Sequence, residues 1–137
     1  MLRYKVMGLL NNPDYHDMGQ NYSSEIPRES SELVLLHEID GPDSRTITAT
    51  LSQNGDLIIS GHDLGPKVER AFGFDEYEFK HTIYAAYVKQ FLDTLGVDVS
   101  DSVMATIAKF KGQRYYELAE AIERAKPEIP VHFWSYP

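Results

Sequence analysis

Three short groups of residues carry side chains that could bind a metal ion or transfer a proton. His62-Asp63 and Asp14-Tyr15-His16-Asp17 each combine an imidazole with carboxylate oxygens. Glu76 and Glu78 could be a general acid and base. However, the five histidines occur singly, and none has a second histidine at the spacing of a metal-binding motif. We therefore predict no metal site.

For Asp63 and for the Glu76–Glu78 pair, we favour a non-catalytic explanation. Asp63 stands just before an expected helix, where its side chain could accept hydrogen bonds from free backbone amides. Glu76 and Glu78 share one face of an expected strand, where two solvated carboxylates would repel each other. The sequence has no cysteine and none of the G-x-S-x-G, G-x-x-x-x-G-K-[ST], H-E-x-x-H or G-x-G-x-x-G motifs. We predict no catalytic residues, no cofactor and no enzymatic activity.

Net charge narrows the class of partner. The chain has 137 residues and a formal charge of −8. Residues 14–63 hold ten acids and two bases, so this segment accounts for the excess. A field of this sign repels nucleic acids and anionic membranes and attracts a basic protein. The alternative is that the acidic surface only keeps the protein soluble.

Length and composition indicate how many domains the chain forms and in which cellular compartment it lies. With 42% hydrophobic residues the chain can bury a core, and we predict a single domain over residues 1–137. No apolar run reaches the roughly 18 to 20 residues that span a bilayer, and we expect no signal peptide because too little apolar sequence follows the first five residues. The absence of cysteine agrees with a reducing compartment. We expect a cytoplasmic protein that is a monomer or a weak homodimer.

The first half of the chain predicts mainly strands. Residues 2–7 alternate like a half-buried strand, and residues 11–31 form a long loop or insertion rich in polar residues. Strands are expected over residues 33–39, 45–51 and 56–60. Asn54-Gly55 predicts a two-residue type I′ turn, in which both residues have positive φ. Together these segments predict an antiparallel meander.

The second half predicts one short helix, a strand, three further helices and a last strand. The residues from Gly61 to Pro66 form the junction between the meander and a helix over 66–72, which Gly73 ends. A fourth strand is expected over residues 77–83 and a last strand over 131–136. Between them, apolar residues at helical spacing predict three helices, over residues 88–95, over 100–112 with Ser100 as the N-cap, and over 113–126. The predicted class is α+β: an antiparallel β-meander of about four to five strands packed against three to four helices.

Residues 32–95 resemble a group of small bacterial proteins with no assigned activity. The shared features are a hairpin, a G-x-D-L-G-P turn, a short helix, an E-Y-E strand and a C-terminal F-W-S, here Phe133-Trp134-Ser135. The match departs from the pattern at His62, where glutamine is usual, and does not include residues 1–31. In size and charge these proteins are similar to immunity proteins that neutralise secreted bacterial toxins. The resemblance itself brings no assigned activity, and the likeness to immunity proteins is one of type.

Two functions follow as hypotheses. The first is an acidic binding module, an immunity or antitoxin protein that covers the active site of a cognate basic toxin such as a nuclease. The second is a small enzyme or ligand-binding protein with a site over residues 61–66. For the first hypothesis, the expected partner-binding residues are Asp14, Tyr15, Asp17, Tyr22, Glu25, Glu29, Asp40, Asp43, His62 and Asp63.

Overall fold

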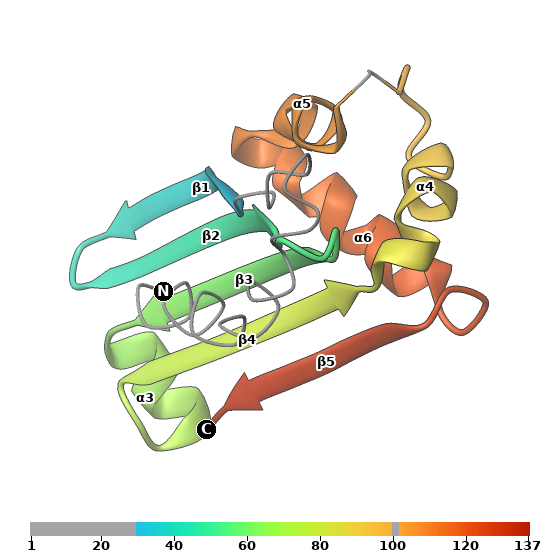
Figure 1. Ribbon diagram of the computed structural model, residues 1–137. Coiled ribbons are helices and arrows are strands. Elements are labelled where there is room, and N and C mark those ends of the chain that lie inside the picture. Colours follow the sequence, from blue (N-terminus) through green and yellow to red (C-terminus); the bar gives the residue numbers. More distant parts are fainter. Residues whose placement is uncertain (1–29, 100–101) are drawn as a thin grey trace, which may run out of the picture.

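The computed structural model describes residues 30–99 and 102–137 and has the predicted α+β class. Five strands form one antiparallel sheet in the order of the sequence, which confirms the meander (Figure 1). The strands are β1 (Ser31–Asp40), β2 (Asp43–Leu51), β3 (Leu57–Leu64), β4 (Glu76–Ile83) and β5 (Val131–Tyr136). The predicted strand over 2–7 and nearly all of the 11–31 loop lie outside the described residues.

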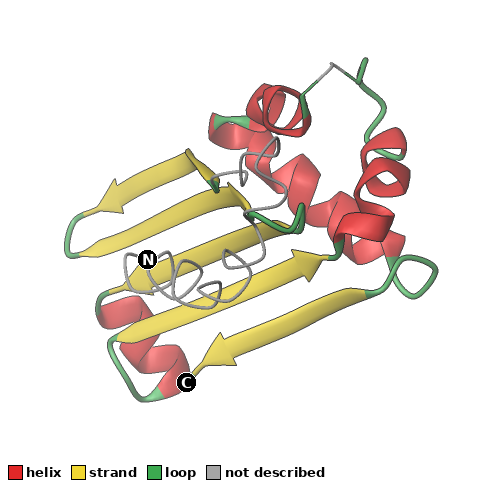
Figure 2. Ribbon diagram, in the orientation of Figure 1, coloured by secondary structure: helices red, strands yellow, loops and turns green. Residues whose placement is uncertain are grey.

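Helices gather at two places along the sheet. They are α3 (Pro66–Phe72), α4 (Ala85–Asp93), α5 (Val103–Ile107), the 3₁₀ turns η2 (Ala108–Phe110) and η3 (Gly112–Arg114), and α6 (Tyr115–Ala125). Figures 1 and 2 show α4, α5 and α6 together at one end of the sheet and α3 at the opposite end. The predicted helix over 66–72 is confirmed residue for residue, with Pro66 first and Gly73 as a left-handed C-cap. No helix of this part of the chain is long and apolar enough to cross a membrane.

The core lies between one face of the sheet and the helices α4 to α6. Alternate residues of β2 and β3, among them Ile47 and Ile59, point to this face and are fully buried. Phe91 of α4 and Leu118 and Ile122 of α6 are buried against them. Burial of such a side chain contributes roughly 1.5–3 kcal/mol, so this packing fixes the helical end of the sheet.

The junction over residues 61–66 differs from the prediction. β3 does not stop at Gly61 but continues to Leu64, and Asp63 is a strand residue paired with Arg45. The N-cap of α3 is Gly65, which has no side chain, and the amide of Lys67 is bound instead by Asp43 Oδ1 at 2.9 Å. The predicted capping role of Asp63 is therefore wrong.

Two other local predictions are also corrected. No non-glycine residue among those described has positive φ, so the Asn54-Gly55 turn is not type I′. The connection runs from Ser52 to Asp56, with the Gly55 amide donating to the Ser52 carbonyl and Ser52 Oγ accepting from two further amides. The second C-terminal helix is capped by Ser102, whose hydroxyl accepts from the Ala105 amide. The predicted cap, Ser100, lies outside the described residues.

The C-terminal strand is confirmed over Val131–Tyr136, and three of its aromatic side chains are largely exposed. β5 is held by backbone pairing with β4, while Phe133, Trp134 and Tyr136 remain 42–56% exposed. Lys80 lies over the Trp134 ring at 5.2 Å from its centroid. The strand therefore presents aromatic surface on both faces of the sheet edge.

Candidate functional site

A pocket of about 530 Å³ opens where the β1–β2 turn, the end of β3 and the start of α3 meet. Four carboxylates and two basic groups line it, so we call it the acidic pocket. Its residues are Glu38, Ile39, Asp40, Asp43, Ser44, Arg45, Asp63, Leu64, Lys67 and Val68. Ile39 and Leu64 are exposed at 70% and 40%, which gives the acidic pocket an apolar rim. The combination suits a cationic group carried on a hydrocarbon chain.

An ion pair forms the floor of the acidic pocket. Arg45 Nε donates to Asp63 Oδ1 and Arg45 Nη2 donates to Asp63 Oδ2, both at 2.8 Å. Only 12% of the Asp63 side chain is exposed, against 37% for Arg45. The hydrogen bonds to Asp63 raise the pKa of Arg45 further, so the guanidinium stays charged. With both oxygens occupied, Asp63 is poorly placed to act as a general base.

Side chains from the C-terminal helices close one wall. Arg45 Nη1 donates to Tyr116 Oη at 3.4 Å, and Tyr116 Oη donates to Glu38 Oε1 at 3.2 Å. Gln113 Nε2 donates to the other Glu38 oxygen at 2.8 Å. These hydrogen bonds join β1 and β2 to η3 and α6. Glu38, Tyr116, Arg45 and Asp63 therefore form one continuous hydrogen-bond network.

The opposite wall belongs to α3. Lys67 Nζ forms an ion pair with Asp40 Oδ2 at 3.0 Å, and Asp43 holds the backbone amide of the same lysine. Both side chains of the Asp40–Lys67 pair are mostly exposed, at 79% and 61%. Solvent screens such a pair, so a charged group of a partner can replace Lys67 at little cost.

A row of aromatic rings continues from the acidic pocket along the same face of the sheet. Phe72 stacks on Tyr77 with centroids 4.4 Å apart, and Tyr77 lies opposite Asp63 in the strand register. Phe79, His81 and Phe133 follow at centroid distances of 5.0 to 5.9 Å. Phe72 and Phe133, at the two ends, are about half exposed. We call these five residues the aromatic row.

A second group of polar residues lies on the other face of the sheet. His62 follows the pleat away from the acidic pocket, and its Nε2 is 2.6 Å from Glu76 Oε2 and 3.7 Å from Glu78 Oε2. Glu78 is directly opposite His62 in the register, and only 17% of its side chain is exposed. Glu76 and Glu78 do share one face of β4, and the Glu76 side chain is 42% exposed. The prediction that the two carboxylates simply repel is wrong, because the His62 imidazole lies near both of them.

The structure separates the residues that the sequence grouped as partner-binding. Asp40, Asp43 and Asp63 meet in the acidic pocket, whereas His62 lies on the opposite face. The predictions for Asp14, Tyr15, Asp17, Tyr22, Glu25 and Glu29 lie outside the described residues. Sequence reasoning missed Glu38, Lys67 and Tyr116, which come from segments far apart in the chain. No spacing signal could have joined Glu38 to Tyr116.

No protein-family model, no curated protein and no solved structure matches the chain.

Proposed function

We propose that the protein is an acidic binding module of the immunity or antitoxin type, which neutralises a cognate basic toxin in the cytoplasm by covering its active site. The observation that carries this proposal is the acidic pocket. It places Glu38, Asp40, Asp43 and Asp63 around an opening of about 530 Å³, which has room for a large basic side chain. A basic side chain of the toxin fits an opening with this charge.

The charge balance of the acidic pocket supports a cationic partner. Four carboxylates face two bases, and Asp63 is fully occupied by Arg45. Asp40 is satisfied by an exposed lysine that a partner can displace. Glu38 lines the acidic pocket and accepts one hydrogen bond at each oxygen, from Tyr116 and from Gln113, both uncharged donors. A lysine or arginine of the toxin would then be bound mainly by Glu38 and Asp40.

The aromatic row supplies the contact area that charge alone does not give. Rings that are half exposed, such as Phe72 and Phe133, are costly in water and are typical centres of protein interfaces. They lie on the same face as the acidic pocket, so one partner could contact both. Cationic side chains also bind to ring faces, which favours a basic partner again.

The competing function, an enzyme or ligand-binding site over residues 61–66, has weaker support. Asp63 uses both oxygens on Arg45, and Gly61, Asp63 and Leu64 are residues of strand β3. His62 points to the other face and does not reach Asp63. The residues of the 61–66 segment therefore do not converge on one point where a substrate could bind.

The test begins with the neighbouring gene. We expect an adjacent gene for a secreted protein with a toxic C-terminal domain, and co-expression of the present chain should restore growth to cells producing that domain. Binding of the two purified proteins should be fast and should weaken with salt. Absence of binding to the neighbouring product, or failure to restore growth, would contradict the proposal.

A charge-neutralised variant tests the role of the acidic pocket itself. Glu38→Gln together with Asp40→Asn keeps the shapes of the two side chains and removes two charges, so association should slow by about tenfold and become less sensitive to salt. The matched control is Glu120→Gln together with Glu128→Gln, which removes two exposed carboxylates outside the acidic pocket. Equal rates for the two variants would show that the partner does not use this pocket.

A further inference from the structure

We propose that His62, Glu76 and Glu78 form a binding site for a first-row divalent metal ion such as Zn²⁺. The site lies on the sheet face opposite the acidic pocket and is independent of the proposed partner. Its three side chains come from neighbouring strands, with His62 on β3 and both glutamates on β4. We call these three residues the His–Glu cluster.

Geometry is the first support for the His–Glu cluster. One potential ligand atom from each side chain lies within 4.8 Å of the other two. Ligand atoms around a cation at about 2.1 Å are about 3 to 3.4 Å apart in tetrahedral or octahedral sites. The observed separations from His62 Nε2, 2.6 and 3.7 Å, bracket that range. Small side-chain rotations would therefore bring the three atoms around one ion.

The backbone makes the arrangement rigid. His62 and Glu78 are direct cross-strand neighbours, and Glu76 is the next residue of β4 on the same face. β3 and β4 are interior strands of the sheet, each paired on both sides. Sites built on strands hold their ligands more closely than sites built on loops. Folding already brings the three ligand side chains together, so metal binding loses little further conformational entropy.

A separate observation next to the His–Glu cluster points to a missing polar partner. Ser60 lies on the same face of β3, one same-face position before His62, and is 95% buried since its exposure is 5%. Its Oγ has no hydrogen-bond partner among the described residues. Three protein ligands leave coordination positions for water on the ion. Neighbouring same-face positions of a strand are about 7 Å apart, so Ser60 Oγ would reach the ion through a chain of two waters rather than one.

Ligand chemistry selects the class of ion. An imidazole nitrogen suits Zn²⁺, Fe²⁺ or Ni²⁺, and the two carboxylates neutralise the double charge. Mg²⁺ prefers a shell of oxygens, keeps most of its water and binds imidazole poorly. The His–Glu cluster should therefore take Zn²⁺ in preference to Mg²⁺.

The experiment is calorimetric titration of the full chain, freed of metal with a chelator, with Zn²⁺ alone and with Mg²⁺ alone. We expect one Zn²⁺ to bind per chain, with no Mg²⁺ binding at the same concentrations, and Zn²⁺ should raise the melting temperature. His62→Ala should weaken Zn²⁺ binding by more than about tenfold and remove the melting shift. No Zn²⁺ binding by the native chain, or equal affinity for the two ions, would overturn the proposal.

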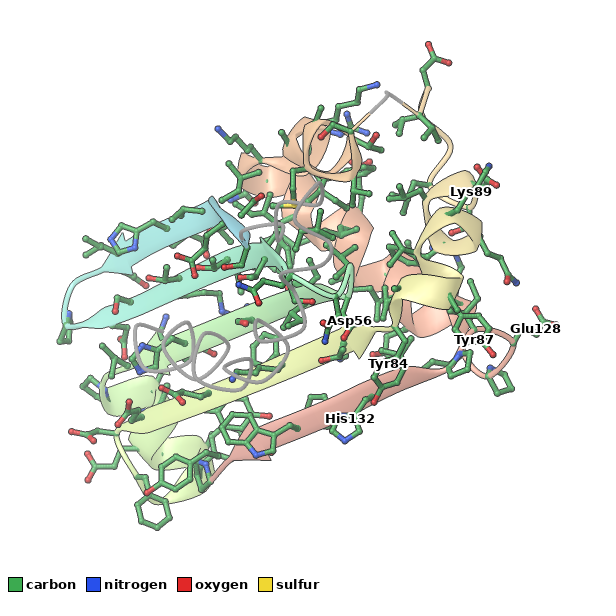
Figure 3. All side chains as sticks on the ribbon, viewed as in Figure 1. Asp56, Tyr84, Tyr87, Lys89, Glu128 and His132 are labelled. Carbon is green, nitrogen blue, oxygen red and sulfur yellow. The ribbon has the colours of Figure 1, made fainter. Side chains whose placement is uncertain are left out.

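Two control variants test whether Zn²⁺ binds at a different histidine. His132→Ala removes a histidine of β5, a strand that contributes no residue to the His–Glu cluster (Figure 3). His16→Ala removes the histidine of the Asp14–Asp17 group. Both variants should bind Zn²⁺ normally. Loss of binding in His16→Ala with normal binding in His62→Ala would overturn the proposal. If His62→Ala fails to fold, Glu76→Gln gives the same test, because the Glu76 side chain is 42% exposed and less needed for packing.

Discussion

Arg45 and Asp63 face each other directly across β2 and β3, and both carboxylate oxygens accept hydrogen bonds of 2.8 Å from the guanidinium. The pair stands on the same face of the sheet as the core, toward the end of β2 and β3 where α3 lies. It forms the floor of the acidic pocket. Tyr116 ties the pair to α6.

The first prediction concerns this ion pair. Asp63→Asn removes one charge and leaves the Arg45 guanidinium without its carboxylate, so we expect a loss of about 1–3 kcal/mol in the free energy of unfolding. The lower part of that range is favoured because the Arg45 side chain is 37% exposed and water can solvate it. Urea denaturation measures the change. Arg124→Met, which breaks an exposed pair with Glu120, should leave the urea midpoint unchanged.

The same pair shows what the sequence could and could not predict. A two-residue turn at Asn54-Gly55 would pair Arg45 with Leu64, whereas the longer observed connection pairs Arg45 with Asp63. A slip of one residue moves every side chain to the other face of the sheet. The strands themselves were predictable from alternation, but their register depends on the turn. The Arg45–Asp63 pair therefore could not be derived.

The His–Glu cluster also depends on the register between two strands. Alternation correctly places Glu76 and Glu78 on one face of β4. What brings His62 between them is the connection through α3, which sets the register of β3 against β4. No local pattern encodes that register, because it results from packing of the helix on the sheet. Helix positions were easier to predict, since α3 and α6 end at the expected glycine and proline.

The second prediction concerns Gly61, which allows a ring to lie on the sheet. A Cβ added at Gly61 would come within 2.1 Å of Phe79, its cross-strand neighbour. Gly61→Ala must therefore displace the ring, and we expect a loss of about 1–3 kcal/mol in the free energy of unfolding. In the Phe79→Leu background the same change should cost less, because the smaller side chain can move aside. Strictly additive effects in the double variant would rule out the contact as the cause.

The third prediction concerns a long-range cap. Asp56 Oδ1 accepts a hydrogen bond of 2.8 Å from the amide of Ala85 at the start of α4, beside Tyr84 (Figure 3). Tyr84 is the N-cap position and provides no side-chain bond, so Asp56 fulfils this function from the preceding hairpin. Asp56→Ala should lower the free energy of unfolding by about 1 kcal/mol. Asp56→Asn keeps the acceptor and should lose less. Thermal melts of the two variants make the comparison.

The fourth prediction is a pH dependence that starts at His81. The ring is packed between Phe79 and Phe133, and its side chain is only 15% exposed. Glu123 of α6 and Lys126, the residue that follows α6, are the charged groups that act on it. Burial, and after it the charge of Lys126, lowers the pKa of His81, while Glu123 opposes the shift. The neutral imidazole is therefore the form that the folded protein favours.

The sign of the effect follows from proton binding. Above pH of about 6.5 the histidine is neutral in both states and contributes no pH dependence. As the pH falls below this value, the unfolded chain binds a proton that the folded protein resists, so stability decreases until the folded-state pKa is passed. Urea denaturation from pH 7.5 to 5.5 should show a steeper loss for the native chain than for His81→Gln. Because all other histidines are common to both proteins, an identical slope would mean that His81 is not the group responsible.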